Sequence, residues 1–149
     1  TTADYSDINI VAVRVFDNYL YVAGNYLGED EEIPSTGIWR NQITSSSGSL
    51  GERGLVLDWV ETSGTNSKIT SLTFDETGKM YISSDGDIGV ATVDVGGSFD
   101  LLYPKIVFGP IVKMTWGAGN YLYLNYRGST PAIYRLELSV LGAPYYGRP

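Results

Sequence analysis

The chain has 149 residues, enough for one domain that buries most of its apolar surface. Its net charge of −7 argues against nucleic acid and anionic membrane surfaces as partners. It contains neither cysteine nor histidine, which excludes disulfides and the usual nucleophile–base pairs of catalysis. Its apolar runs are far shorter than the roughly 18 residues of a membrane-spanning helix, so we expect no membrane insertion.

The first predicted hairpin covers residues 11–24, and a long loop follows at residues 25–36. This loop carries four consecutive acids, Glu29, Asp30, Glu31 and Glu32. Their oxygen atoms suit a divalent cation, but their spacing matches no known metal-binding loop, and runs of like charge repel and stay solvated. We therefore expect an exposed loop and no metal site.

A second insertion, residues 44–54, is rich in Ser and Gly, a composition typical of a flexible loop. It precedes a predicted strand at residues 56–60. Binding residues tend to lie on long loops of a rigid β-scaffold. The two loops thus supply the residues that we expect to contact a partner: Glu29, Asp30, Glu31, Glu32, Ser47, Glu52 and Arg53.

Residues 68–95 carry the clearest pattern, three strands joined by two tight turns. Asp75 opens the first turn and Gly78 completes it with the positive φ that such a corner needs. The second turn contains Asp85 and Asp87. These acids resemble calcium ligands, but Asp and Gly are also the ordinary residues of turns, and we prefer that interpretation. A fourth run follows at residues 99–103.

The same strand pattern occurs three times when the chain is aligned on Tyr21, Tyr81 and Tyr123. The repeats cover about residues 10–62, 68–104 and 110–147, with Tyr145 and Tyr146 in the place of the last fourth strand. Four strands in roughly 40–50 residues are typical of a propeller blade. We therefore predict one all-β domain, residues 1–149, with three four-stranded antiparallel blade-like repeats that form part of a β-propeller. A two-layer β-sandwich is the alternative.

The segment L-T-F-D-E-T-G-K-M-Y-I of the middle repeat resembles the blades of the broad NHL and YVTN propeller families. Their blades share a run of the form apolar-x-F-D-x-x-G-x-aliphatic-Y-aliphatic. The other two repeats depart from it, with Val15 and Trp116 in place of the Phe. The resemblance implies the fold and no particular activity.

Candidate chemistry is sparse. No phosphate-binding glycine motif occurs, so we expect no nucleotide or other cofactor. A glycosidase needs two carboxylates, but the available acids fit turns or, as Asp94 and Glu137 do, equivalent strand positions. The aromatic side chains are either sugar-stacking platforms or packing between blades; they include Trp39, Trp59, Trp116 and Tyr134.

We therefore expect a non-catalytic structural or interaction module, not an enzyme, that presents loops within a larger assembly such as a virion tail or an extracellular surface structure. A carbohydrate-binding, lectin-like propeller and a glycoside-acting enzyme domain are the alternatives. The expected partners are other protein chains or the rest of a larger polypeptide, with a glycan as an alternative. Three blades leave two open faces, each expected to carry apolar and aromatic side chains. This predicts that the chain self-associates, aggregates or needs a larger polypeptide or partner.

Overall fold

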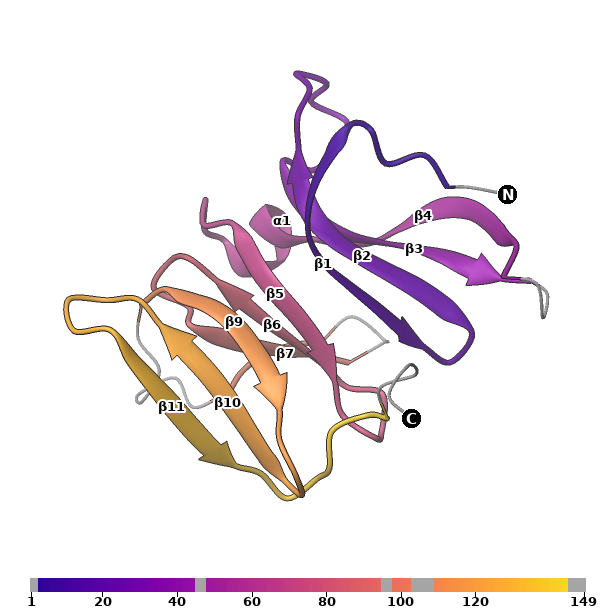
Figure 1. The fold of residues 1–149 in the computed structure, drawn as a ribbon. Helices are drawn as coiled ribbons and strands as arrows, with labels where there is room; N and C mark the ends of the chain where they lie inside the picture. The colour runs from indigo at the N-terminus through magenta and orange to yellow at the C-terminus, as the bar shows by residue number, and fades with distance from the viewer. Residues whose placement is uncertain (1–2, 45–47, 95–97, 103–108, 145–149) are drawn as a thin grey trace.

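The computed structural model describes residues 3–44, 48–94, 98–102 and 109–144. It confirms the all-β prediction: three antiparallel sheets lie one after another along the chain, and they are not closed into a ring (Figure 1). One short helix, α1, accompanies them in the described residues.

The first sheet has the strand order β1-β2-β3-β4. Its strands are β1 (Ile8–Phe16), β2 (Tyr19–Tyr26), β3 (Thr36–Ile43) and β4 (Leu50–Asp58). Asp17 and Asn18, with φ values of 45° and 61°, form the two-residue corner between β1 and β2. Asp and Asn adopt such left-handed angles more readily than other residues with a side chain.

The prediction of a loop through residue 54 was wrong, because β4 begins at Leu50. Glu52 and Arg53 therefore lie in a strand, where Arg53 is paired with Asn41 of β3. Local Gly and Ser content favoured a loop, but the backbone hydrogen bonds of the ladder outweigh that weak local preference. Ser47 lies outside the described residues.

The predicted strand at residues 56–60 was also partly wrong, because the chain turns into α1 (Trp59–Ser63). The Asp58 side chain accepts a hydrogen bond from the Glu61 N–H at 3.0 Å and so caps the first turn. Gly64 ends the helix with φ of 67° and donates its N–H to the Val60 carbonyl. Trp59 is completely buried beneath this turn.

The second sheet has the order β5-β6-β7-β8. Its strands are β5 (Ile69–Phe74), β6 (Met80–Ser84), β7 (Val90–Val93) and β8 (Phe99–Leu101). Every residue of β6 and β7 is buried, because the neighbouring sheets cover both faces. Gly78 has the predicted positive φ, 91°.

The third sheet has the order β11-β10-β9. Its strands are β9 (Ile111–Trp116), β10 (Tyr121–Tyr126) and β11 (Ala132–Glu137). The predicted fourth strand, at Tyr145 and Tyr146, lies outside the described residues. Residues 141–143 instead join the second sheet: Glu76 donates its N–H to the Leu141 carbonyl and Ala143 donates to the Phe74 carbonyl.

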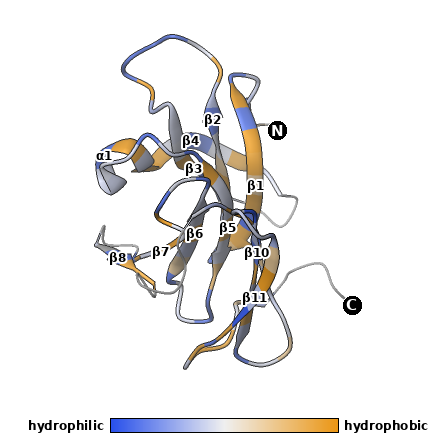
Figure 2. Cartoon of the chain, turned by 90° about the vertical axis from the view of Figure 1, so that its left-hand side faces the viewer, coloured by the Kyte–Doolittle hydropathy of each residue, from blue (hydrophilic) through white to orange (hydrophobic). Residues whose placement is uncertain are grey.

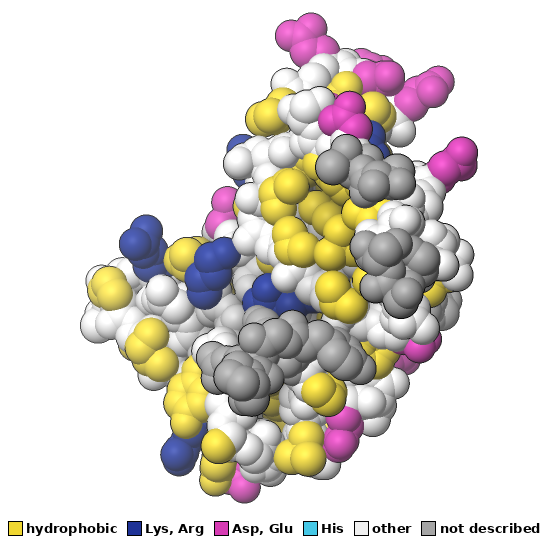
Figure 3. Space-filling view, turned by 45° about the vertical axis from the view of Figure 1, so that its right-hand side comes forward, with side chains coloured by type: hydrophobic (Ala, Val, Ile, Leu, Met, Phe, Trp, Pro, Cys, Tyr) yellow, Lys and Arg dark blue, Asp and Glu magenta, His cyan; other side chains and the backbone are white. Residues whose placement is uncertain are grey.

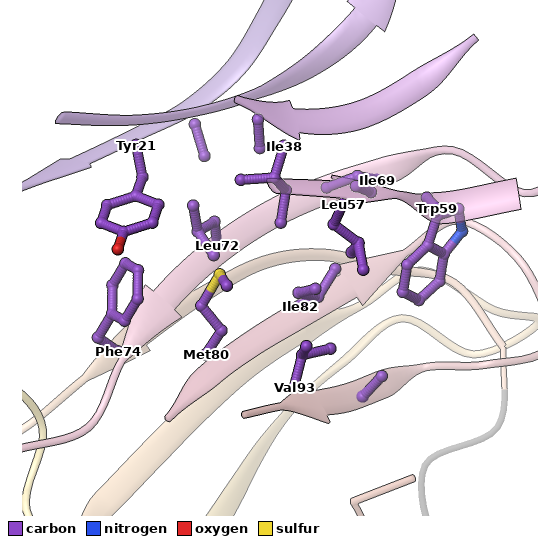
Figure 4. Packing of buried hydrophobic residues seen from close by; sticks show 13 residues of the cluster. Tyr21, Ile38, Leu57, Trp59, Ile69, Leu72, Phe74, Met80, Ile82 and Val93 are labelled. Carbon is purple, nitrogen blue, oxygen red and sulfur yellow. The ribbon is translucent and has the colours of Figure 1, made fainter. Parts of the chain in front are cut away.

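Two hydrophobic clusters hold the three sheets together. The first lies between the first and second sheets and includes Tyr21, Ile38, Leu72 and Met80 (Figure 4). The second joins the second and third sheets through Tyr81, Leu122 and other apolar side chains. β5 contacts β1 on one side and β9 on the other. This arrangement fits neighbouring propeller blades, and it also fits a layered sandwich.

The open face of the third sheet carries aromatic side chains, as predicted, together with polar ones. Along β10, Leu122 and Leu124 are buried toward the second sheet, whereas Tyr121, Tyr123 and Asn125 alternate with them and point away. The first sheet does have an apolar outer face, and hydrophobic residues extend along much of β1 (Figure 2). No helix in the described residues is long and apolar enough to cross a membrane.

Candidate functional site

The acidic loop between β2 and β3 is exposed, as predicted for Glu29, Asp30, Glu31 and Glu32. Three of these acids line a surface hollow of about 390 Å³ that Asp58, the cap of α1, also borders. Within the described ranges, no three acidic side chains are grouped closely enough to hold a metal ion. The loop therefore has the geometry of a solvated segment beside a shallow depression.

Arg53, which was expected to contact a partner, binds the N-terminal segment of its own chain. Its guanidinium donates to both carboxylate oxygens of Asp7, at 2.7 and 2.8 Å, and lies 5.2 Å from the centre of the Tyr5 ring. The hydrogen bond from Arg53 holds the pKa of Asp7 below its usual value. Tyr5 donates to Asn41 Oδ1 at 2.7 Å, and burial raises the pKa of its phenol.

Asp75 is the only charged side chain that is buried in the described part of the chain, with an exposed fraction of 1%. Its Oδ1 accepts hydrogen bonds from the N–H and hydroxyl of Thr77 and from the Lys79 N–H. These bonds close the turn that the sequence predicted. Its Oδ2 accepts a hydrogen bond from the Tyr81 phenol at 3.0 Å. The carboxylate therefore serves both the turn and a buried carboxylate–phenol pair.

The Asp75–Tyr81 pair borders a hollow of about 260 Å³, which we call the Asp75 hollow. Its polar wall comes from the second sheet and the turn before β6: Asp75, Thr77, Lys79, Tyr81 and Thr92. Its apolar wall includes Leu102, Leu138 and Val140. The Lys79 ammonium lies 3.8 Å from Asp94 and is partly exposed. The residues that line this hollow thus include a carboxylate, a phenol, a lysine and three hydroxyl-bearing residues, Ser139 among them.

Sequence analysis found Asp75 only as a turn residue. Its partner Tyr81 belongs to the next strand, six positions later, and was recognised only as a position on which the three repeats align. The hairpin brings the two side chains together because Tyr81 pairs with Thr73, two residues before Asp75. The spacing F-D-x-x-G-x-x-Y is therefore the signal that could have identified the pair.

A third, smaller hollow of about 160 Å³ lies where β1 and β5 meet the C-terminal segment. Its walls are mainly apolar, formed by Val13, Val15, Phe74 and Pro144, and Arg14 is its charged lining residue. It contains no carboxylate among its described lining residues. It therefore offers neither a carboxylate nor a phenol for acid–base chemistry among those residues.

No protein-family model matches this chain, and no curated protein matches it significantly in sequence. A solved structure with a similar fold is that of a luciferin-regenerating enzyme, with a TM-score of 0.60 and 10% sequence identity. The match covers 95% of this chain and 65% of the enzyme, so this chain spans about two thirds of the enzyme's length. The identity is too low to show more than a shared fold.

This comparison contradicts the predicted function. A non-catalytic structural module was expected because the chain lacks His and Cys and because its acids fit turns. The structurally similar protein is an enzyme, so the fold itself is no argument against catalysis. The prediction rested on the turn positions of the acids, and those positions did not reveal that Asp75 is buried.

Proposed function

We propose that this chain is part of a β-propeller enzyme that hydrolyses small esters at the Asp75 hollow. The observation that carries the proposal is the buried carboxylate–phenol pair at the wall of a cavity, Asp75 with Tyr81. The fold shared with a luciferin-regenerating enzyme supports a catalytic role, since that protein carries out chemistry on the same scaffold.

The chain lacks histidine and cysteine, so a proton must be taken by a carboxylate, a phenol or an amine. The Asp75 carboxylate accepts a hydrogen bond from the Tyr81 phenol. A water molecule in the hollow attacks the ester carbonyl and gives its proton to Tyr81 as the phenol passes its own proton to Asp75. The tetrahedral intermediate then breaks its bond to the alcohol oxygen, and the alcohol leaves with the proton that returns from Asp75 through Tyr81. Lys79, which lines the same hollow, supplies positive charge for the oxyanion that forms.

The size of the hollow limits the substrate. A cavity of about 150 Å³ holds benzene, so the Asp75 hollow, at about 260 Å³, suits a molecule of roughly ten to twelve non-hydrogen atoms. Apolar side chains form one wall and hydroxyls the other, which favours a short ester with an apolar acyl or alcohol group.

The test compares ester hydrolysis by the unaltered chain with that by Tyr81→Phe, using phenyl acetate and phenyl butyrate, which fall within this size limit. Tyr21→Phe is the matched control, because Tyr21 occupies the equivalent place in the first repeat and lies in the other hydrophobic cluster. We expect Tyr81→Phe to lower kcat at least about 100-fold, the usual contribution of a positioned acid–base group, and Tyr21→Phe to leave it nearly unchanged.

Asp75→Asn completes the series. It keeps an oxygen for the turn but removes the proton acceptor, so hydrolysis is lost while thermal melting confirms that the fold remains. Equal activity in Tyr81→Phe and Tyr21→Phe contradicts the proposal, and so does the absence of hydrolysis above the uncatalysed rate in the unaltered chain.

A further inference from the structure

The ring of Tyr81 packs against a second aromatic ring, that of Trp116. The two rings are nearly perpendicular, with an angle of 87° between their planes and 5.5 Å between their centroids. Tyr81 belongs to β6 and Trp116 ends β9, so the contact joins the second sheet to the third. An edge-to-face pair of this kind fixes the direction in which each ring points.

A similar ring contact occurs at the junction of the first and second sheets. There Tyr21, which aligns with Tyr81 in the repeat, packs on Phe74 with 4.8 Å between the ring centroids. Phe74 occupies the position of Trp116 in its own repeat. The hydroxyl partners differ, because the Tyr21 oxygen accepts a hydrogen bond from Arg40 at 3.3 Å, whereas the Tyr81 hydroxyl donates to a carboxylate at 3.0 Å. The repeat thus supplies the ring contact at both junctions, and at the second it lies beside an acid.

Gly142 packs directly on the indole of Trp116. A Cβ at Gly142 would lie 2.2 Å from Cγ and 2.5 Å from Cδ2 of Trp116, so no side chain fits between the glycine backbone and the ring. The backbone of Gly142 also pairs with that of Asp75 in an antiparallel bridge. Four residues therefore form a closed circuit of contacts, which runs from Asp75 to Tyr81, Trp116 and Gly142 and back to Asp75.

The two packed rings border different hollows. Tyr81 lines the Asp75 hollow, and Trp116 lines a fourth hollow, of about 320 Å³. No described residue lines both. The segment 138–143 borders them in turn, because residues 138–140 line the first and residues 141–143 line the second. The Tyr81–Trp116 contact therefore lies between two spaces, and the loss of either ring would join them.

We infer that Trp116 is a positioning residue that holds the Tyr81 phenol against Asp75, with Gly142 as the support of its indole. The inference rests on the proposed function, since the pair held in place is the acid–base pair of ester hydrolysis. Without the indole, the Tyr81 ring gains room to turn away from the carboxylate, and water reaches the buried hydrogen bond. A displacement of about 1 Å in a catalytic group can cost about 100-fold in rate. Trp116 is not among the described lining residues of the Asp75 hollow, so its loss should affect kcat far more than KM.

The kinetic experiment compares Trp116→Leu and Trp116→Phe with the unaltered chain, using phenyl acetate. Trp116→Leu should lower kcat about 10- to 100-fold and change KM by less than about threefold. Trp116→Phe should recover most of the lost kcat, because a phenylalanine, Phe74, packs on Tyr21 at the first junction. Trp39→Leu is the matched control and should keep kcat within about threefold of that of the unaltered chain. Trp39 is 4% exposed and lies on the outer face of the first sheet, where hydrophobic side chains gather (Figure 3).

A second readout does not depend on hydrolysis. The hydroxyl proton of Tyr81 is buried and hydrogen-bonded to a carboxylate, so it should exchange slowly with water and be visible by NMR in the chain labelled at tyrosine. Its absence from Tyr81→Phe assigns the signal. Trp116→Leu should make this proton exchange at least about tenfold faster, whereas Trp116→Phe and Trp39→Leu should keep the exchange slow. Gly142→Ala should also speed the exchange, because the added methyl group displaces the indole.

The two readouts separate this inference from the proposed function. If the unaltered chain hydrolyses no ester, the proposed function fails, and the exchange rate still tests whether Trp116 holds Tyr81. Hydrolysis that depends on Tyr81 but not on Trp116 overturns the inference and leaves the proposed function standing. Exchange that is equally slow in Trp116→Leu and the unaltered chain, or equally fast in Trp116→Leu and Trp39→Leu, overturns it as well. If thermal melting shows that Trp116→Leu does not fold, Gly142→Ala decides, and unchanged exchange in that variant overturns the inference.

Discussion

Replacing Gly78 with valine should destabilise the fold strongly, for two reasons that can be separated. Gly78 has φ of 91°, where any residue with a Cβ is strained, and the strain is worth about 1–2 kcal/mol. A Cβ there would also lie 3.0 Å from Cε1 of Phe16, whose ring stacks on Phe74 with centroids 4.9 Å apart. Overpacking of this kind costs about 1–3 kcal/mol. We therefore expect a total loss of about 3 kcal/mol.

For a chain of this length, 1 kcal/mol shifts Tm by about 2–4 °C, so Gly78→Val should lower Tm by about 6–12 °C. Gly119→Val is the matched control, since Gly119 lies in the corresponding turn of the third sheet with φ of 69° and a Cβ there would meet no atom within 4 Å. Gly119→Val should lower Tm by about half as much as Gly78→Val, because it introduces only the backbone strain. Glu31→Ala, on the exposed acidic loop, should change stability by less than about 0.5 kcal/mol.

The Tm values of the three variants, measured by calorimetry or circular dichroism, distinguish the contribution of backbone strain from that of overpacking. Equal shifts for Gly78→Val and Gly119→Val would mean that the Phe16 contact contributes nothing. A shift for Gly78→Val as small as that for Glu31→Ala would refute the backbone argument altogether.

Three further predictions concern single contacts, each measured by denaturant unfolding. Trp59→Ala should cost about 3–5 kcal/mol, because it empties a fully buried site and removes the hydrogen bond to Ser67 Oγ. Asp58→Ala should cost about 1 kcal/mol through loss of the α1 cap. Asp7→Asn should cost at most about 1 kcal/mol at pH 7, since the pair with Arg53 is partly exposed. The pKa of Asp7 is lower in the folded chain than its ordinary value of 3.8. The stabilisation from Asp7 is therefore complete above pH 3.8 and is lost as the pH falls through the lower folded pKa. In acid, the unaltered chain and Asp7→Asn should consequently have the same free energy of unfolding.

The second sheet was the part of the fold that sequence predicted best. Ile69, Leu72, Phe74 and Ile82 are all buried, and the turn at Gly78 has the expected angle. Both faces of this sheet are covered, so nearly every residue of its strands is apolar or small, and turn residues mark its corners. Local pattern and tertiary environment agree there, which is the condition under which sequence patterns are most informative.

The first sheet was harder to predict, because tertiary contacts determine the structure of its last strand, β4, and of the helix α1 that follows. Leu50–Asp58 pairs as a strand although Gly51 and Gly54 weaken any local preference for one, and α1 depends on its two caps rather than on helical periodicity. The ion pair between Asp7 and Arg53 joins residues that are 46 positions apart, and no local sequence pattern predicts such a contact. The role of Arg53 in binding the chain's own N-terminal segment therefore could not be predicted.

The Asp75 site was missed because one residue performs two tasks. Its Oδ1 closes a turn, which sequence analysis recognised, while Oδ2 binds the phenol of Tyr81, which it did not. A turn aspartate is ordinarily exposed, and at 1% exposure Asp75 departs from that norm because residues 141–143 pair with the strand end beside it. Burial of its carboxylate is thus the feature that distinguishes Asp75 from an ordinary turn aspartate. The segment around Gly142 causes this burial, and it lies so far along the chain that only the folded structure brings it beside Asp75.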